Sequence, residues 1–175
     1  MKKLNLLLMF LAVIILSAFT VVSTQWKISN GYSIKFFNEH ATGEFEKISG
    51  TIHFDENDLA NSSFNMQVDV KSIATGNFLK NSHAKGEKWF DSDKYPKITF
   101  VSTKISKSAN GFVVEGNLKM KDVTKAIEIP LTFKNNVFSG KFSVNRMDYN
   151  IGSMEGMSKK VGNKIDLEIS VPVIK

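Results

Sequence analysis

Residues 110–134 read NGFVVEGNLKMKDVTKAIEIPLTFK, and the fold class follows from the pattern of this segment. Apolar side chains alternate with polar ones from Val114 to Met120 and again from Ile127 to Phe133. Alternation with a period of two is typical of a β-strand that buries one face. The Asn110-Gly111 pair at the start of the segment is a strong hairpin signal. The segment therefore predicts adjacent antiparallel strands.

The same alternation recurs along the chain from Trp26 onward. Eight runs show it, at residues 34–37, 48–54, 64–71, 98–100, 114–121, 127–134, 138–145 and 165–171. Eight antiparallel strands in about 150 residues can close into a barrel, which removes exposed sheet edges. Residues 75–91 interrupt the alternation and have helical spacing. We therefore predict an all-β fold, an eight-stranded antiparallel lipocalin-like barrel with a short helical insert.

Alternation alone does not tell which face of the barrel is apolar. A soluble barrel directs apolar side chains inward, whereas an outer-membrane barrel directs them toward lipid. Charged residues occupy the middle of several runs, namely Asp69, Lys119, Glu128, Lys141 and Glu168. These charges are normal on a solvated outer face and would need dense pairing inside a narrow barrel. The pattern therefore favours an apolar interior.

The amino terminus has the layout of a secretory signal peptide. A short basic start, Met1-Lys2-Lys3, precedes an unbroken apolar run at residues 6–16 and then small residues. We predict a signal peptide at residues 1–24, with either of two cleavage positions, and a barrel domain at residues 25–175. An uncleaved anchor is the alternative, because residues 4–26 carry no charge. Both readings place the barrel outside the cytoplasm, with the periplasm as the expected location.

Composition excludes several classes of protein. The 175 residues include no cysteine, which excludes disulfides, thiol catalysis and cysteine-based metal sites. The three histidines give no metal-ligand spacing, so we expect no metal and no cofactor. Without Lys2 and Lys3 the chain has 21 basic and 17 acidic residues, a formal net charge of +4 rather than +6. The lysines are scattered, which argues against nucleic acid binding.

Several motifs in one order make the sequence similar to a known family. The first set is Ser72-Ile73-Ala74-Thr75-Gly76-Asn77, His83, Trp89-Phe90-Asp91 and Tyr95-Pro96-Lys97-Ile98-Thr99-Phe100. The second set is Gly116-Asn117-Leu118-Lys119-Met120 with Val123-Thr124-Lys125, and Arg146-Met147-Asp148-Tyr149 with Val161-Gly162-Asn163. The ordered set resembles the YceI-like family, whose members are exported, lipocalin-like barrels associated with polyisoprenoid binding. The resemblance covers essentially all of residues 25–175.

The chain departs from the family pattern at three places. Lys80-Asn81 stands where Arg-Asp is usual, Asp122 where Gly is usual before Val-Thr, and Asn150 where Gly usually follows the aromatic residue. The first departure removes from the helical segment a carboxylate that the family pattern has there, and it leaves the fold that the resemblance implies unchanged.

The resemblance implies a protein that binds a long apolar chain, a polyisoprenoid or a similar lipid, for storage or transport. Inward apolar side chains would bury that chain from water. The same residues would also serve as core in a filled barrel, and both readings stay open. The candidate lining residues are Ile34, Phe36, Ile52, Phe54, Met66, Val68, Val70, Ile98, Phe100, Leu118, Met120, Ile129, Leu131, Phe142 and Val144.

Two polar residues are candidates for contact with a ligand head group. Arg146 shares the parity of Phe142 and Val144, so it is expected to point inward near a strand end. It would hold an anionic head group, or instead pair with Asp148 or lie against an aromatic ring such as Trp26. His83 lies in the helical segment, where it would contact a head group or fix the helix to the barrel.

The sequence gives no support for catalysis. It has no Gly-x-Ser-x-Gly elbow, no phosphate-binding glycine loop and no cysteine nucleophile. A non-enzymatic lipid-binding protein is the expected function. A periplasmic lipid-modifying enzyme and a filled-barrel interaction protein are the alternatives. A membrane surface, an electron-transfer partner and a homodimer remain candidate partners.

Overall fold

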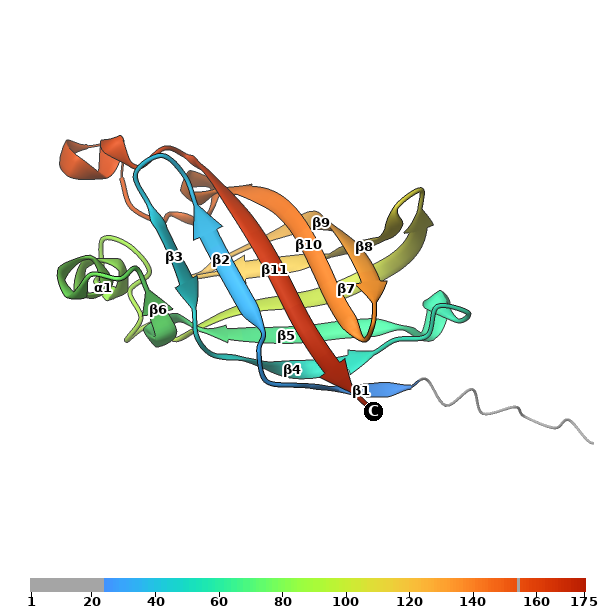
Figure 1. The fold of residues 1–175 in the computed structure, drawn as a ribbon. Helices are drawn as coiled ribbons and strands as arrows, with labels where there is room; N and C mark the ends of the chain where they lie inside the picture. Colours follow the sequence, from blue (N-terminus) through green and yellow to red (C-terminus); the bar gives the residue numbers. More distant parts are fainter. Residues whose placement is uncertain (1–23, 154) are drawn as a thin grey trace, which may run out of the picture.

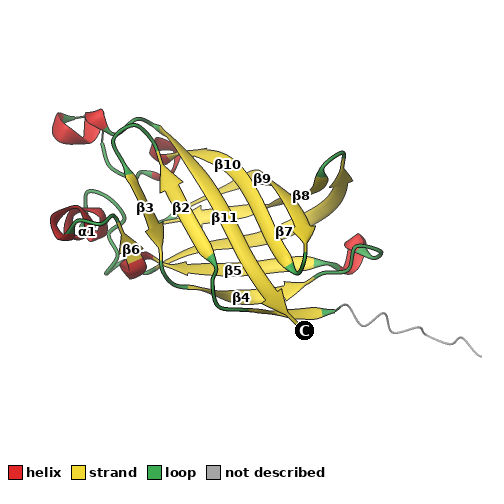
Figure 2. Ribbon diagram, in the orientation of Figure 1, coloured by secondary structure: helices red, strands yellow, loops and turns green. Residues whose placement is uncertain are grey.

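The computed structural model describes residues 24–153 and 155–175, so the predicted signal peptide lies outside the described residues except for Thr24. The described residues form strands and one α-helix, α1 (Phe78–Lys85), with short 3-10 turns between them (Figures 1 and 2). The strands are β1 (Gln25–Ile28), β2 (Ser33–Phe37), β3 (Thr42–Phe45), β4 (Ile48–His53), β5 (Ser63–Asp69), β6 (Ile73–Ala74), β7 (Lys97–Ser108), β8 (Gly111–Met120), β9 (Val123–Lys134), β10 (Val137–Asn145) and β11 (Lys164–Ile174). The turns are η1 (Leu59–Asn61), η2 (Val70–Ser72), η3 (Arg146–Tyr149) and η4 (Gly156–Lys160).

Eight strands of the described chain form a closed antiparallel ring in the order β1-β4-β5-β7-β8-β9-β10-β11. β1 closes the ring, because Trp26 pairs with Ile52 of β4 and Ile28 pairs with Val173 of β11. β2 pairs with residues 166–170 of β11. β3 pairs with β2, and β6 pairs with β3, so these two strands extend the sheet beyond β2. The predicted eight-stranded barrel with a short helix is confirmed.

The eight runs of alternating sequence correspond to β2, β4, β5 and β7–β11. The sequence interpretation missed β1, β3 and β6, which have four, four and two residues. A run of two to four residues is too short to show an alternation of apolar and polar side chains clearly. Gly31 also separates β1 from β2, with φ +86°, a backbone conformation that residues other than glycine rarely adopt.

The interior of the barrel is apolar and its outer face is charged. Along β8, Val114, Leu118 and Met120 are buried, whereas Asn117 and Lys119 between them are exposed. Ion pairs lie on the outer face, with Nζ–Oε distances of 2.9 Å for Lys104–Glu115 and 3.2 Å for Lys141–Glu168. Exposed pairs of this kind add little to stability, but they keep the surface solvated.

One end of the barrel is filled by aromatic rings, here called the aromatic plug (Trp26, Phe54, Phe64, Phe112, Phe133 and Phe138). The ring of Phe54 lies at its centre, edge-on to Phe112, Phe138 and Phe133 at centroid distances of 5.0, 5.1 and 5.2 Å. The indole N–H of Trp26 donates to the carbonyl of Phe54 at 2.9 Å. β1 begins and β11 ends at this same end (Figure 1). The plug therefore closes the barrel where the described chain starts and stops.

The opposite end carries α1 and the short strands β3 and β6 (Figure 2). Asn77 caps the helix, because its side-chain oxygen accepts from the backbone N–H of Lys80 at 3.0 Å. The hydroxyl of Thr75 donates to the Asn81 side-chain oxygen at 2.7 Å, which ties the helix to the end of β6. Among the described residues, no helix is both long and apolar enough to cross a bilayer.

Candidate functional site

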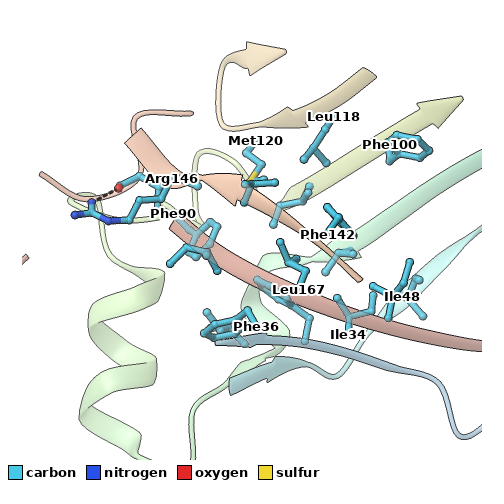
Figure 3. Close-up of a pocket in the computed structure, with 18 of the residues that line it drawn as sticks. Ile34, Phe36, Ile48, Phe90, Phe100, Leu118, Met120, Phe142, Arg146 and Leu167 are labelled. Carbon is cyan, nitrogen blue, oxygen red and sulfur yellow. Dashed lines mark hydrogen bonds between the residues drawn. The ribbon is translucent and has the colours of Figure 1, made fainter. Parts of the chain in front are cut away.

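A cavity of about 460 Å³ occupies the barrel between the aromatic plug and α1. Its walls come from β2–β11, and Figure 3 shows apolar side chains of these strands pointing toward one another, among them Ile34, Phe100 and Phe142. The exposed residues His40, Lys80 and His83 also line it. The cavity therefore reaches the surface between α1 and the β2–β3 hairpin, a place here called the mouth.

Most of the predicted lining residues meet at this cavity. Thirteen of the fifteen line it, and so do both candidate head-group residues, Arg146 and His83. The thirteen are Ile34, Phe36, Ile52, Met66, Val68, Ile98, Phe100, Leu118, Met120, Ile129, Leu131, Phe142 and Val144. Several of them, such as Met66 and Phe142, are only partly buried although they face inward, because the cavity leaves part of their surface uncovered.

Phe54 and Val70 are corrections to the predicted lining, since the structure places neither on the cavity wall. Phe54 follows β4 and is packed into the aromatic plug, with 2% of its surface exposed. Val70 begins the 3-10 turn η2, where the period of two no longer applies, and is 1% exposed. Both are core residues of the barrel.

The sequence interpretation missed a further part of the wall. β11 contributes Ile165, Leu167, Ile169 and Val171, whose alternation was visible in the sequence. Phe45, Trp89 and Phe90 also line the cavity. Trp89 and Phe90 follow α1 in an irregular segment, where no periodicity indicates the direction of a side chain.

Aromatic rings form the wall nearest the mouth. Phe45 lies between Phe36 and Phe90, with ring centroid distances of 5.6 and 5.9 Å. Gly43, on the strand beside Phe36, leaves the space that the Phe36 ring fills, since a Cβ there would lie 2.7 Å from the ring. These rings give the inner mouth a rigid apolar surface that loses little conformational entropy when it is covered.

Arg146, the single arginine of the sequence, lies at the edge of the cavity with 2% of its surface exposed. Its guanidinium donates to backbone carbonyls of the following loop, including those of Ile151 at 2.7 Å, Val161 at 2.9 Å and Ser158 at 3.1 Å. One of the hydrogen bonds of Arg146 is drawn in Figure 3. Burial lowers the pKa of Arg146. The side chain therefore holds the loop after β10 in place.

Of the two alternatives expected for Arg146, the structure shows contact with an aromatic ring, although the ring is not Trp26, and it does not show an ion pair with Asp148. Asp148 pairs with Lys125 at 3.5 Å, and the aromatic ring against Arg146 is Trp89, with 5.4 Å between the guanidinium carbon and the ring centroid. Trp26 lies in the aromatic plug and has Lys175 over its ring. Gly152 completes the packing, because a Cβ there would lie 2.6 Å from the guanidinium and the residue has φ +73°.

The mouth carries polar and cationic groups from separate elements. Lys80 and His83 come from α1, while His40 comes from the β2–β3 hairpin and lies 3.8 Å from the Glu39 carboxylate. The side chain of Asn38 shapes this hairpin by accepting from the backbone N–H groups of His40 and Ala41 at 2.9 and 2.7 Å. The mouth can thus present one ammonium group, that of Lys80, and two imidazole side chains to a ligand whose remainder lies in the apolar cavity.

Acidic side chains do not contribute to the cavity wall in the part of the chain that the structure describes. None of the described residues that line the cavity is Asp or Glu. Within the described chain, no group of three or more His, Asp or Glu side chains is arranged to hold a metal ion. The chemistry of the cavity wall is therefore that of apolar contact, with hydrogen bonding and positive charge confined to its rim.

Comparison with known proteins places the chain in a family. The family model of the YceI-like domain matches residues 19–173. The YceI protein of Escherichia coli is 27% identical over 189 aligned positions, covering 98% of this chain and 97% of that protein. A UPF0312 protein of Yersinia enterocolitica is 27% identical over 76% of this chain and 73% of that protein.

Solved structures share the barrel. BcnA of Burkholderia cenocepacia is 25% identical with a TM-score of 0.77, over 85% of this chain and all of that chain. A polyisoprenoid-binding domain from Saccharophagus degradans, implicated in plant cell wall breakdown, is 13% identical with a TM-score of 0.59, over 83% of this chain and 95% of that one. At this identity the likeness to the second structure is one of fold. Because the family model spans nearly all of the described barrel, this chain belongs to the YceI-like family.

Proposed function

We propose that this protein binds one long apolar chain, such as a polyisoprenoid, inside the barrel and stores or carries it without chemical change. The observation that carries the proposal is the apolar cavity, which is closed by the aromatic plug at one end and reaches solvent at the other. A cavity of about 460 Å³ lies within the range of small-molecule sites in proteins, roughly 300–1,000 Å³. The binding domain from Saccharophagus degradans, which has the same fold, adds support.

The driving force for binding would be the burial of hydrocarbon. Each buried methylene contributes about 0.8 kcal/mol, so a chain that buries ten of them gains on the order of 8 kcal/mol before the costs of association. The partly exposed inward residues, such as Met66, Val68 and Phe142, supply the surface that the ligand would cover. Met66 and Met120 adapt to a flexible ligand because the thioether side chain is unbranched.

The head group would lie at the mouth. Lys80 and His83 are exposed there and can donate to phosphate or another polar group. Arg146 has a different position, because its guanidinium is directed to the carbonyls of the loop. Of the two candidate head-group residues, His83 is therefore retained in the proposal, with Lys80 beside it.

The proposed location is the periplasm, with residues 1–24 acting as a signal peptide. The basic start and the apolar run of residues 6–16 support this location. A lipid carrier in that compartment would move its ligand through water between membranes or between proteins, which an enclosed apolar cavity makes possible.

Native mass spectrometry of the protein purified from a bacterial host, followed by organic extraction, tests the proposal. We expect a bound lipid of defined mass in the natural chain. The variant Val144→Trp fills the cavity and should lose that lipid. The matched control is Val101→Trp, which adds the same ring on the outer face, where Val101 is 45% exposed. A clean apo mass that incubation with polyprenyl and quinone lipids does not change would contradict lipid binding.

A further inference from the structure

The first turn of α1 exposes two large apolar side chains to solvent. Phe78 is 88% exposed and Leu79 is 60% exposed, more than Phe37, Val101 or Ile174 elsewhere on the described surface. Neither is needed to hold the helix, because Asn77 caps α1 and Ala84 packs against the core. Exposed aromatic and aliphatic residues that are adjacent, rather than scattered singly, mark a site of interaction.

The charges around this pair have one predominant sign. Residues 75–91 contain three lysines, Lys80, Lys85 and Lys88, and two carboxylates, Glu87 and Asp91, both of which follow the helix. All three lysines and Glu87 fall on or directly after α1, and Lys80 and Lys85 lie within the helix itself. Aromatic and aliphatic side chains with lysines nearby in the same helical segment are typical of segments that lie in the interface of an anionic membrane.

The position of the pair relates it to the cavity. Lys80, His83 and Ala84 of the same helix line the cavity, and Leu79 and His83 lie one helical turn apart. α1 stands at the end of the barrel opposite the aromatic plug, away from β1 and from the carboxyl terminus (Figure 1). A surface that contacts Phe78 and Leu79 would therefore also face the mouth.

We propose that Phe78 and Leu79, flanked by Lys80, Lys85 and Lys88, form a docking tip that inserts into an anionic lipid bilayer and brings the mouth to its surface. The two apolar side chains enter the headgroup region, while the lysines contact lipid phosphates. The occupant is a membrane rather than a protein groove, because the apolar group is small and its neighbours are cationic. The proposal gives the lipid-binding function proposed above a place of loading and release, but docking itself requires no ligand in the cavity.

Co-sedimentation with vesicles tests the tip. We expect the protein to bind vesicles of phosphatidylcholine with phosphatidylglycerol, and to bind pure phosphatidylcholine vesicles weakly. Phe78→Ser with Leu79→Ser should lower the partition coefficient by about a hundredfold, since each side chain contributes about tenfold when buried. Lys85→Glu with Lys88→Glu should lower it about tenfold or more on the mixed vesicles only.

Two control variants make the same chemical changes at the plugged end. Ile174→Ser removes an apolar side chain that is 53% exposed, and Lys107→Glu reverses a charge on the residue that pairs with Phe112 of the aromatic plug. Both should bind vesicles as the natural chain does. Equal binding by the natural chain and the Phe78/Leu79 variant would overturn the proposal, and so would an absence of vesicle binding by the natural chain.

The lipid content of each variant, measured by native mass spectrometry, separates this proposal from the lipid-binding function. A docking variant that retains bound lipid but no longer binds vesicles supports the tip. If the natural chain binds vesicles but carries no lipid in its cavity, the docking tip is supported and lipid carriage is contradicted. If sedimentation velocity instead shows a dimer that the Phe78/Leu79 variant abolishes, the tip is a self-association surface and the membrane proposal is wrong.

Discussion

The guanidinium of Arg146 lies over the indole ring of Trp89, with 5.4 Å between the guanidinium carbon and the ring centroid. This contact joins the loop that follows β10 to the segment that follows α1, two parts of the chain that both line the cavity. Because Arg146 also donates to carbonyls at Ile151 and Val161, one side chain fixes the shape of the loop and its distance from the helix.

Arg146→Lys is expected to destabilise the protein by about 3 kcal/mol, although it keeps the positive charge. An ammonium cannot reproduce the planar fork, so one or two of the carbonyls at Ile151, Ser158 and Val161 lose their donor, at roughly 1.5–3 kcal/mol for each lost charged hydrogen bond. Urea unfolding measures the change. Lys125→Arg, made beside exposed Asp148, is the control and should alter stability by less than about 0.5 kcal/mol. If Arg146→Lys left the free energy of unfolding unchanged, other contacts would hold the loop.

Phe54 and Phe142 test whether the interior is divided into a plug and a cavity. Phe54→Ala should cost about 3–5 kcal/mol, because it leaves a void among four aromatic neighbours. Phe142→Ala should cost less, since one side of that ring already faces the cavity and is only partly buried. The free energies of unfolding of the ligand-free proteins give the comparison. Equal losses would indicate that the barrel is filled at both positions.

Tyr149 should give the protein an alkaline loss of stability. Burial, with a smaller contribution from Asp148, raises the pKa of Tyr149 above the ordinary 10.0. Because the folded form holds this proton more tightly, the contribution of Tyr149 is complete below pH 10.0 and declines as the pH rises from there toward the folded value. Tyr149→Phe should flatten this decline in thermal unfolding measured across alkaline pH. Tyr95→Phe is the control, and a decline unchanged in Tyr149→Phe would show that another group causes it.

Lys80→Gln with His83→Gln tests the placement of the head group. We expect the affinity for a prenyl phosphate to fall about fivefold, the effect of losing exposed charge contacts worth about 1 kcal/mol. The affinity for the matching prenyl alcohol should stay the same, because the apolar chain makes identical contacts. Fluorescence competition measures both ligands. Lys107→Gln serves as a charge control at the plugged end, and an equal loss for phosphate and alcohol would place the head group elsewhere.

The strands of five or more residues and the composition of the cavity wall were predicted from the sequence, because a strand of that length shows its period of two. The prediction of inward-facing residues was wrong or incomplete where the period of two is interrupted. Ile105 shows the effect inside a strand, since a bulge between Ser102 and Lys104 of β7 changes the parity and brings Ile105 into the core. Val70 shows it at the end of β5, where the 3-10 turn η2 begins.

The environment of Arg146 shows what local pattern cannot supply. Its inward direction followed from the parity of β10, but the carbonyls it contacts at Ser158 and Val161 lie twelve and fifteen residues further along the chain. Trp89, its aromatic neighbour, lies in the segment without regular structure that follows α1, far from Arg146 in the sequence. Such contacts depend on how loops close over a finished barrel, and no spacing in the sequence indicates them.

The ring of strands is joined at β1 by short ladders, in which Gln25 and Trp26 pair with β4 while Lys27 and Ile28 pair with β11. By contrast, β10 and β11 share nine paired positions. Tension applied to the chain ahead of Gln25 would therefore separate β1 from β4 and β11 first. Because β1 lies at the end of the barrel that holds the aromatic plug, a force on the amino-terminal side would open the barrel from that end.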